Sequence, residues 1–202
     1  MVAPFHAPMR DLPFSNPQSH EAAVSTLLLT RQIFSQLRCH FWLVCGTLLG
    51  VIRDHGFIAH DSDIDVGVWD DDPAADPQAI QLAFTQAGFS LANQFGSAGH
   101  GRQLAFWSPF GTYLDLYFMV REPARCWLSV WVNGKLGKLI YQPISEFLTI
   151  EFCGEPFLIP ANYEQQFIDQ YGADWRVPVA PVEQGGSYDW SSSALNTEWE
   201  GS

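Results

Sequence analysis

The chain has 202 residues, of which 47% are hydrophobic and 16% are charged, a balance typical of globular rather than disordered proteins. This length is enough for one domain with its own core and is short for two. The formal net charge is −12 and no basic run occurs, so the composition argues against nucleic acid as a partner.

The first 38 residues predict an arm followed by a helix. Residues 1–15 are expected to be an irregular N-terminal arm, and they contain no apolar signal-peptide core. Asn16 and Pro17 suit the cap and first position of a helix that continues to about Arg38. No apolar run in the chain approaches membrane-spanning length, so we expect a soluble, cytoplasmic protein. The cysteines are widely spaced, which predicts buried small hydrophobes at Cys39, Cys45, Cys126 and Cys153.

Residues 41–53 predict a strand, a turn and a helix in close succession. Residues 41–44 are apolar and β-prone, as expected of a short buried strand. Gly46 and Thr47 then favour a tight turn, and residues 48–53 favour the first turns of a helix. A helix that begins directly after such a turn leaves free backbone N–H groups that suit a phosphate.

Acidic residues follow at alternate positions. Asp61, Asp63 and Asp65 alternate with apolar residues, so an extended chain buries one face and lines up carboxylates on the other. Carboxylate oxygens are the ligands that hard divalent cations prefer, which predicts an Mg²⁺ or Mn²⁺ site. The acidic residues 70–72 are interpreted instead as a solvated turn.

The middle of the chain predicts one more helix and a hairpin. Asp76 and Pro77 suit the start of a helix through Ala87, and residues 89–95 suit a short strand. Residues 103–107 and 113–120 predict a hairpin. Asp115 is the only charged residue in the second of these strands, and a charge there is expensive unless it is paired, bound to metal or on an exposed edge.

Two further hairpins and a helix are predicted before the end of the chain. Residues 126–132 and 137–142 flank Asn133-Gly134, a strong hairpin signal, and residues 147–152 and 157–159 flank a second turn. Asn162 and Gln165 suit a capping box for a helix that ends at Gly172. Residues 179–202 are rich in Pro, Gly, Ser and Glu and are expected to form a flexible tail.

Several of these segments together carry a family resemblance. The combined string resembles the LicD/fukutin-related family of the nucleotidyltransferase superfamily, which includes DNA polymerase beta; it consists of Gly46-Thr47-Leu48-Leu49-Gly50, Arg53, Gly56-Phe57-Ile58 and Asp63-Ile64-Asp65. Tyr171-Gly172 and Asp174-Trp175 are similar to the C-terminal end of LicD-type sequences. The resemblance implies an α/β (α+β) fold, with a mixed sheet flanked by helices, in a single domain over residues 16–178.

The resemblance also implies a function. It predicts a phosphotransferase that moves a phosphocholine-like or ribitol-phosphate-like group from a CDP-activated donor to a glycan hydroxyl. Asp63, Asp65 and Asp115 would hold Mg²⁺ or Mn²⁺, and Asp115 would also help to deprotonate the acceptor. The backbone N–H groups of Gly46 and Thr47, with the Thr47 hydroxyl, would position the donor phosphates.

Four further residues are candidates at the site, and two other functions stay open. Arg53 is expected to contact phosphate or to pair with a nearby aspartate, and Asp61 to orient the metal ligands. His100 and Arg102 are candidates for substrate contact. One alternative is a nucleotidyltransferase that moves a nucleoside monophosphate from a triphosphate to a small molecule or protein. The other is a non-catalytic protein that binds nucleotides or glycans.

Overall fold

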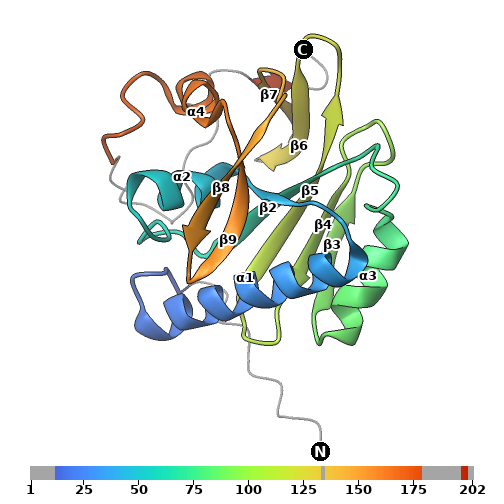
Figure 1. The fold of residues 1–202 in the computed structure, drawn as a ribbon, viewed down its shortest axis with the longest axis vertical. Coiled ribbons are helices and arrows are strands. Elements are labelled where there is room, and N and C mark those ends of the chain that lie inside the picture. Colours follow the sequence, from blue (N-terminus) through green and yellow to red (C-terminus); the bar gives the residue numbers. More distant parts are fainter. Residues whose placement is uncertain (1–11, 133–134, 179–196, 200–202) are drawn as a thin grey trace, which may run out of the picture.

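The computed structural model describes residues 12–132, 135–178 and 197–199, which form a mixed β-sheet flanked by helices (Figure 1). In chain order its elements are α1 (Pro17–Leu37), β1 (Trp42–Leu43), α2 (Cys45–Arg53), β2 (Asp63–Trp69), α3 (Pro77–Gln86), β3 (Ser90–Phe95), β4 (Gln103–Trp107), β5 (Tyr113–Arg121), β6 (Cys126–Val132), β7 (Lys135–Tyr141), β8 (Phe147–Phe152), β9 (Glu155–Pro160), α4 (Tyr163–Tyr171) and β10 (Thr197–Trp199). The predicted α/β (α+β) class and single-domain organisation are confirmed.

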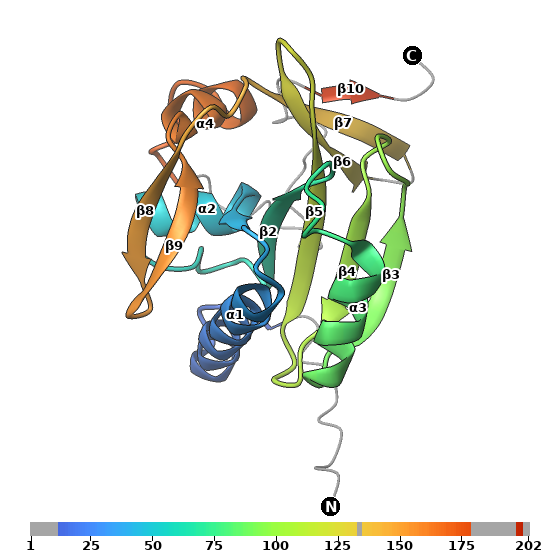
Figure 2. The ribbon, with the colours of Figure 1, turned by 45° about the vertical axis from the view of Figure 1, so that its right-hand side comes forward.

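The sheet runs in the order β10-β7-β6-β5-β2-β1-β9-β8, and β4 joins β3 to it through β5. The β2–β5 and β1–β9 pairs are parallel, whereas the other pairs are antiparallel. The sheet forks at one edge of β5, because its first five residues pair with β4 and its last two with β6 (Figure 2). All three predicted hairpins are present, although the turn residues 133–134 lie outside the described residues.

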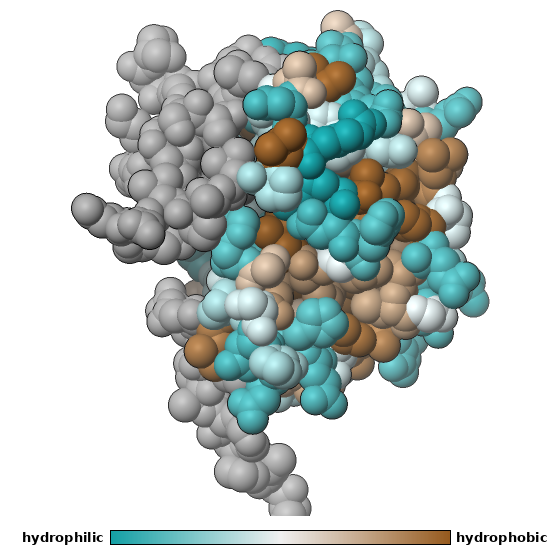
Figure 3. Space-filling view, turned by 90° about the vertical axis from the view of Figure 1, so that its left-hand side faces the viewer, coloured by the Kyte–Doolittle hydropathy of each residue, from teal (hydrophilic) through white to brown (hydrophobic). Residues whose placement is uncertain are grey.

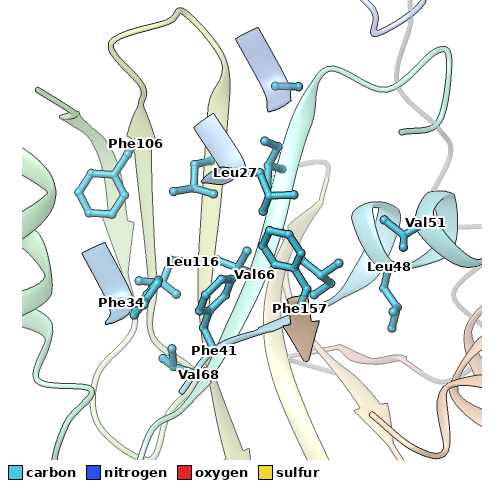
Figure 4. Packing of buried hydrophobic residues seen from close by; sticks show 14 of the residues in the cluster. Leu27, Phe34, Phe41, Leu48, Val51, Val66, Val68, Phe106, Leu116 and Phe157 are labelled. Atoms are coloured by element: carbon cyan, nitrogen blue, oxygen red, sulfur yellow. The ribbon is translucent and has the colours of Figure 1, made fainter. Parts of the chain in front are cut away.

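Side-chain alternation gives the central strands two different faces. The even-numbered residues of β2 and β5 point into the main hydrophobic core, where Val66 and Leu116 lie near Leu27 and Phe34 of α1 (Figure 4). Helices α1 and α3 cover this face of the sheet (Figures 1 and 2). The odd-numbered residues face the opposite side, so the predicted aspartates are placed away from the core.

Helix α2 begins earlier than the sequence predicted. The turn lies at Cys45, whose φ of 48° is in the left-handed region, and Gly46 and Thr47 already belong to the first helical turn. A Cβ atom on Gly50 would lie 2.6 Å from the carbonyl oxygen of Gly56 and 2.9 Å from the backbone nitrogen of Ile58. Glycine at this position therefore lets the segment before β2 pack directly against the helix.

Part of the predicted N-terminal arm supports that same segment. Phe14 is buried, its N–H donates to the carbonyl oxygen of Asp61 at 2.8 Å, and the N–H of Ser15 donates to Ala59 at 2.7 Å. The ring of Phe14 also packs on Phe57, with 5.0 Å between centroids. Residues 12–15 thus help to fix the approach to β2.

The C-terminal part differs from its prediction in two places. The predicted capping box at α4 is wrong, because the Asn162 side-chain oxygen accepts from Gln166 while Gln165 donates to Asp169. In the predicted tail, Thr197–Trp199 pair with β7, and residues 179–196 and 200–202 lie outside the described residues.

On the side of the molecule shown in Figure 3, hydrophobic residues are interspersed with hydrophilic ones. Within residues 12–132, 135–178 and 197–199, no helix combines the length and the apolar character needed to cross a bilayer. Cys39, Cys45 and Cys126 are buried as predicted, whereas Cys153 is only partly buried.

Candidate active site

Three aspartates meet on two neighbouring parallel strands. Asp63 and Asp65 lie on β2 and Asp115 lies on β5, with Asp65 directly opposite Asp115 in the register. One carboxylate oxygen from each residue lies within 4.8 Å of the others. The strand pairing therefore brings Asp115 together with Asp63 and Asp65, which precede it by 52 and 50 residues, so the three predicted metal-ligand candidates meet.

The carboxyl groups of Asp65 and Asp115 have raised pKa values. Burial raises the pKa of both Asp65 and Asp115, and the negative charge of Asp63 raises each further. Only 6% of Asp65 is exposed. Buried like charges are unfavourable unless protons or a cation balance them, and an all-oxygen cluster of this kind suits a hard divalent cation.

Helix α2 holds Asp65 from its first turn. Asp65 Oδ2 accepts from the backbone N–H groups of Gly46 at 3.1 Å and Thr47 at 3.4 Å, and the N–H of Asp65 donates to Thr47 Oγ1 at 2.8 Å. The carboxylate thus occupies the helix N-terminus where a phosphate was predicted. Thr47 is buried and is absent from the described residues that line the cavity at the site. Its hydroxyl accepts a hydrogen bond from the backbone of Asp65, and the predicted contact of this hydroxyl with phosphate stays a prediction.

Thr47→Val is expected to lower the free energy of unfolding by about 1–3 kcal/mol, because it leaves the buried N–H of Asp65 without an acceptor. Thr47→Ser keeps the hydroxyl and should recover most of this loss. Chemical denaturation of the two variants beside the wild type measures the difference. Equal stabilities for valine and serine would show that the hydroxyl does not hold β2.

Gln103 on β4 holds Asp115 in a similar way. Its Nε2 donates to Asp115 Oδ1 at 2.6 Å, and the side chain is only 8% exposed. Gln103 pairs with Tyr117 and Ala105 with Asp115, so the odd-numbered residues of β4 share the face of the aspartates. Sequence reasoning missed Gln103, although alternation along the predicted hairpin could have identified it.

The predicted substrate contacts at His100 and Arg102 stay predictions, and neither side chain is placed at the aspartates. Arg102 directly precedes β4, and its guanidinium is 5.3 Å from the centroid of Phe118 in the main core. His100 is exposed in the loop before β4. Neither residue occurs among the described residues that line the cavity. A shift of one residue along a strand reverses the face, which explains why the neighbour Gln103 is at the site instead.

Arg53 and Asp61 complete the surroundings of the cluster. Arg53 lines the cavity and forms a two-point contact with Asp54, at 2.7 Å for both nitrogens, whereas its predicted contact with phosphate stays a prediction. Burial raises the pKa of the Asp61 carboxyl, and the charge of Asp63 and a hydrogen bond to it raise it further. A Cβ atom on Gly46 would lie 2.6 Å from Asp61 Oδ2, so glycine makes room for this carboxylate. Its orienting role stays a prediction.

The cluster opens into a cavity of about 510 Å³. The aspartates and Gln103 form the polar part of its lining. Leu49, Ile58 and Trp175, which all belong to the main hydrophobic core, form an apolar part that is here called the apolar end. This volume lies within the range of small-molecule sites. The arrangement can therefore hold a ligand whose charged part meets the carboxylates, through a cation, while its less polar part lies on the apolar end.

Comparisons with known proteins agree with this geometry. The family model described as LicD/FKTN/FKRP, nucleotidyltransferase domain, matches residues 38–162. The human ribitol-5-phosphate transferase FKTN is 28% identical over 183 residues, covering 90% of this chain and 38% of the relative. Its mouse counterpart is 28% identical over 181 residues, covering 89% and 37%. An uncharacterized Caenorhabditis elegans protein is 26% identical over 182 residues, covering 87% and 45%. The chain spans less than half the length of these relatives.

Proposed function

The chain belongs to the LicD/FKTN/FKRP nucleotidyltransferase-domain family, a family of transferases, and we propose that it moves a phospho-alcohol group from a CDP-activated donor to a glycan hydroxyl. The transferred group would be of the ribitol-phosphate kind, as the names of the FKTN relatives suggest, or of the phosphocholine kind that the LicD resemblance implies. The observation that carries the proposal is the cluster of Asp63, Asp65 and Asp115 at the end of a cavity large enough for such a donor.

The three aspartates would hold the Mg²⁺ or Mn²⁺ that we propose as cofactor. A divalent cation bound there supplies positive charge that stabilises the phosphate oxygens as the bond to the leaving group breaks. The protein itself contributes the orientation of the carboxylates. Gly46 and Thr47 fix Asp65 through one oxygen, and Gln103 fixes Asp115 through one oxygen.

Transfer then requires a proton acceptor beside the incoming hydroxyl. The acceptor oxygen attacks the donor phosphorus that carries the alcohol, the new O–P bond forms, and the P–O bond to CMP breaks. Asp115 would take the hydroxyl proton, because a carboxylate within reach of the incoming hydroxyl can act as a general base. The products are the phospho-alcohol ester of the glycan and CMP.

Transfer of a nucleoside monophosphate is the second candidate, since the matching family model is itself described as a nucleotidyltransferase domain. The same residues would serve, but the attack would fall on the α-phosphorus of a triphosphate and release pyrophosphate. The two reactions are distinguished by their donor, which is a CDP-alcohol in the first and a nucleoside triphosphate in the second.

Thermal unfolding with CDP-ribitol, CDP-choline, CTP or ATP, each with and without Mg²⁺ or Mn²⁺, tests the proposal. A ligand at 100 times its Kd adds about 2.7 kcal/mol to the free energy of unfolding and so raises the midpoint. We expect a metal-dependent shift with a CDP-alcohol, and CMP release when a glycan acceptor is added. A shift with triphosphates alone, with pyrophosphate release, would favour nucleotidyl transfer. No shift and no turnover with any donor would overturn both.

A further inference from the structure

The turn after α4 has no part in the chemistry described above, yet it lines the same cavity. Residues 171–177, here called the C-terminal turn, contribute Tyr171, Asp174, Trp175 and Val177 to the cavity wall. This turn lies beyond the part of the chain that the family model matches. The metal and proton-transfer roles proposed for the aspartates give these lining residues no function.

The C-terminal turn is held in one conformation by its own contacts. Gly172, with φ of 93°, ends the helix, and its carbonyl oxygen accepts from the N–H of Trp175 at 3.2 Å. The Trp175 side chain is 96% buried, since 4% is exposed, and its ring lies 4.7 Å from Phe167 between centroids. The guanidinium of Arg176 lies 4.1 Å from the centre of the same ring. The wall is thus formed before any ligand binds.

Helix α2 connects this wall to the acid cluster. Gly46, Leu49 and Arg53 all line the cavity, and their spacing of three and four residues places them on one face of the helix. From Gly46 to Arg53 the helix rises about 10 Å, at 1.5 Å per residue. A ligand with its phosphates at the aspartates therefore has room to extend along α2 toward the apolar end.

The chemistry of that end suits an uncharged, ring-containing group. Leu49, Ile58 and Trp175 are buried apolar residues of the main hydrophobic core, and all three line the cavity. Asp174 adds a carboxylate, and among the described lining residues Arg53, already paired with Asp54, is the only arginine or lysine. A second phosphate would be repelled there. Asn93, another lining residue, belongs to the largely exposed strand β3, which leaves that part of the cavity wall open to an acceptor.

We propose that the C-terminal turn, together with Leu49 and Ile58, binds the nucleoside part of the donor and so determines which activated donors the protein accepts. This inference rests on the proposed function, which places the donor phosphates at the aspartates. Base and ribose then lie against the apolar end, and the phospho-alcohol and the acceptor lie toward β3 and β4.

Val177→Trp tests this assignment with little risk to the fold, because Val177 is 64% exposed. The larger tryptophan side chain should fill part of the cavity next to the C-terminal turn. Leu148→Trp is the matched control, since Leu148 is 48% exposed on β8 and does not line the cavity among the described residues. Calorimetric titration in Mn²⁺ gives the Kd of CDP, UDP, ADP and inorganic pyrophosphate for both variants and the wild type.

We expect the Kd of CDP to rise at least fivefold in Val177→Trp, while Leu148→Trp and the Kd of pyrophosphate stay within twofold of wild type. A rise smaller than fivefold, or an equal rise for pyrophosphate, would overturn the inference. Failure of the wild type to bind any of the three nucleotides would also overturn it. Absence of CDP-alcohol turnover in a wild type that binds CDP would instead count against the proposed function alone.

Discussion

Asp115→Asn is expected to lower the transfer rate by at least about 10²–10³-fold and, in the metal-free protein, to raise the free energy of unfolding by about 1–2 kcal/mol. The loss of activity follows from removing one cation ligand and the proton acceptor together. The gain in stability follows because the partly buried Asp115 has a carboxylate oxygen within 4.8 Å of two other carboxylates, and asparagine keeps the shape without the charge. Turnover of a CDP-alcohol and urea denaturation measure the two effects.

The same substitution should change how stability depends on pH. Burial and the charge of Asp63 raise the pKa of Asp115 in the folded protein, whereas the unfolded pKa is about 3.9. The folded state therefore binds the proton more tightly, and its stability falls as pH rises from about 4 through the raised pKa. Asp115→Asn removes this contribution, so its unfolding free energy, measured with a chelator present, should fall less with rising pH than that of wild type.

Asp71→Asn is the control for charge removal as such. Asp71 is exposed and pairs with Arg121 at 2.6 Å, and surface pairs contribute only about 0–1 kcal/mol. Its loss should neither stabilise the metal-free protein nor reduce transfer. If Asp115→Asn were no more stable than wild type without metal, the buried carboxylates would not be a source of strain in this fold.

Local signals predicted much of the fold. Asn16 caps α1 and Asp76 caps α3 as expected, because a cap depends on residues only two or three positions away. Alternation along β2 placed Asp63 and Asp65 on one face for the same local reason. Asp115 was singled out because a lone charge in an apolar strand is costly without a partner, and the family resemblance then assigned it to the metal site.

Contacts between distant segments could not be predicted in this way. Thr47 was expected to contact phosphate, but its partner is the backbone of Asp65, 18 residues later, which depends on how α2 packs against β2. Arg102 was a candidate for substrate contact, and Gln103 was not considered. The register between β4 and β5 decides which of these two side chains faces the aspartates, because a shift of one residue moves each side chain to the other face of the sheet.

Gln103→Leu is expected to weaken Mn²⁺ binding and donor turnover by roughly 10–100-fold, the effect typical of losing a group that orients a metal ligand. Leucine fills a similar volume but cannot donate to Asp115 Oδ1, so that carboxylate loses the contact that fixes its rotation. Gln103→Glu should be more severe, because it places another carboxylate beside Asp115 where the structure has an amide. Calorimetric titration with Mn²⁺ provides a measurement that does not depend on activity.

Gln94→Leu is the matched control for Gln103, since Gln94 is an exposed glutamine on the neighbouring strand β3, opposite Leu104 in the register. It removes the same amide from the same part of the sheet without touching Asp115, and its Mn²⁺ affinity should equal that of wild type. Wild-type Mn²⁺ affinity in Gln103→Leu would mean that Asp115 keeps its orientation without the amide. The order expected instead, with Gln94→Leu unchanged, Gln103→Leu weaker and Gln103→Glu weakest, follows from the charge and hydrogen bonding that each side chain offers to one carboxylate.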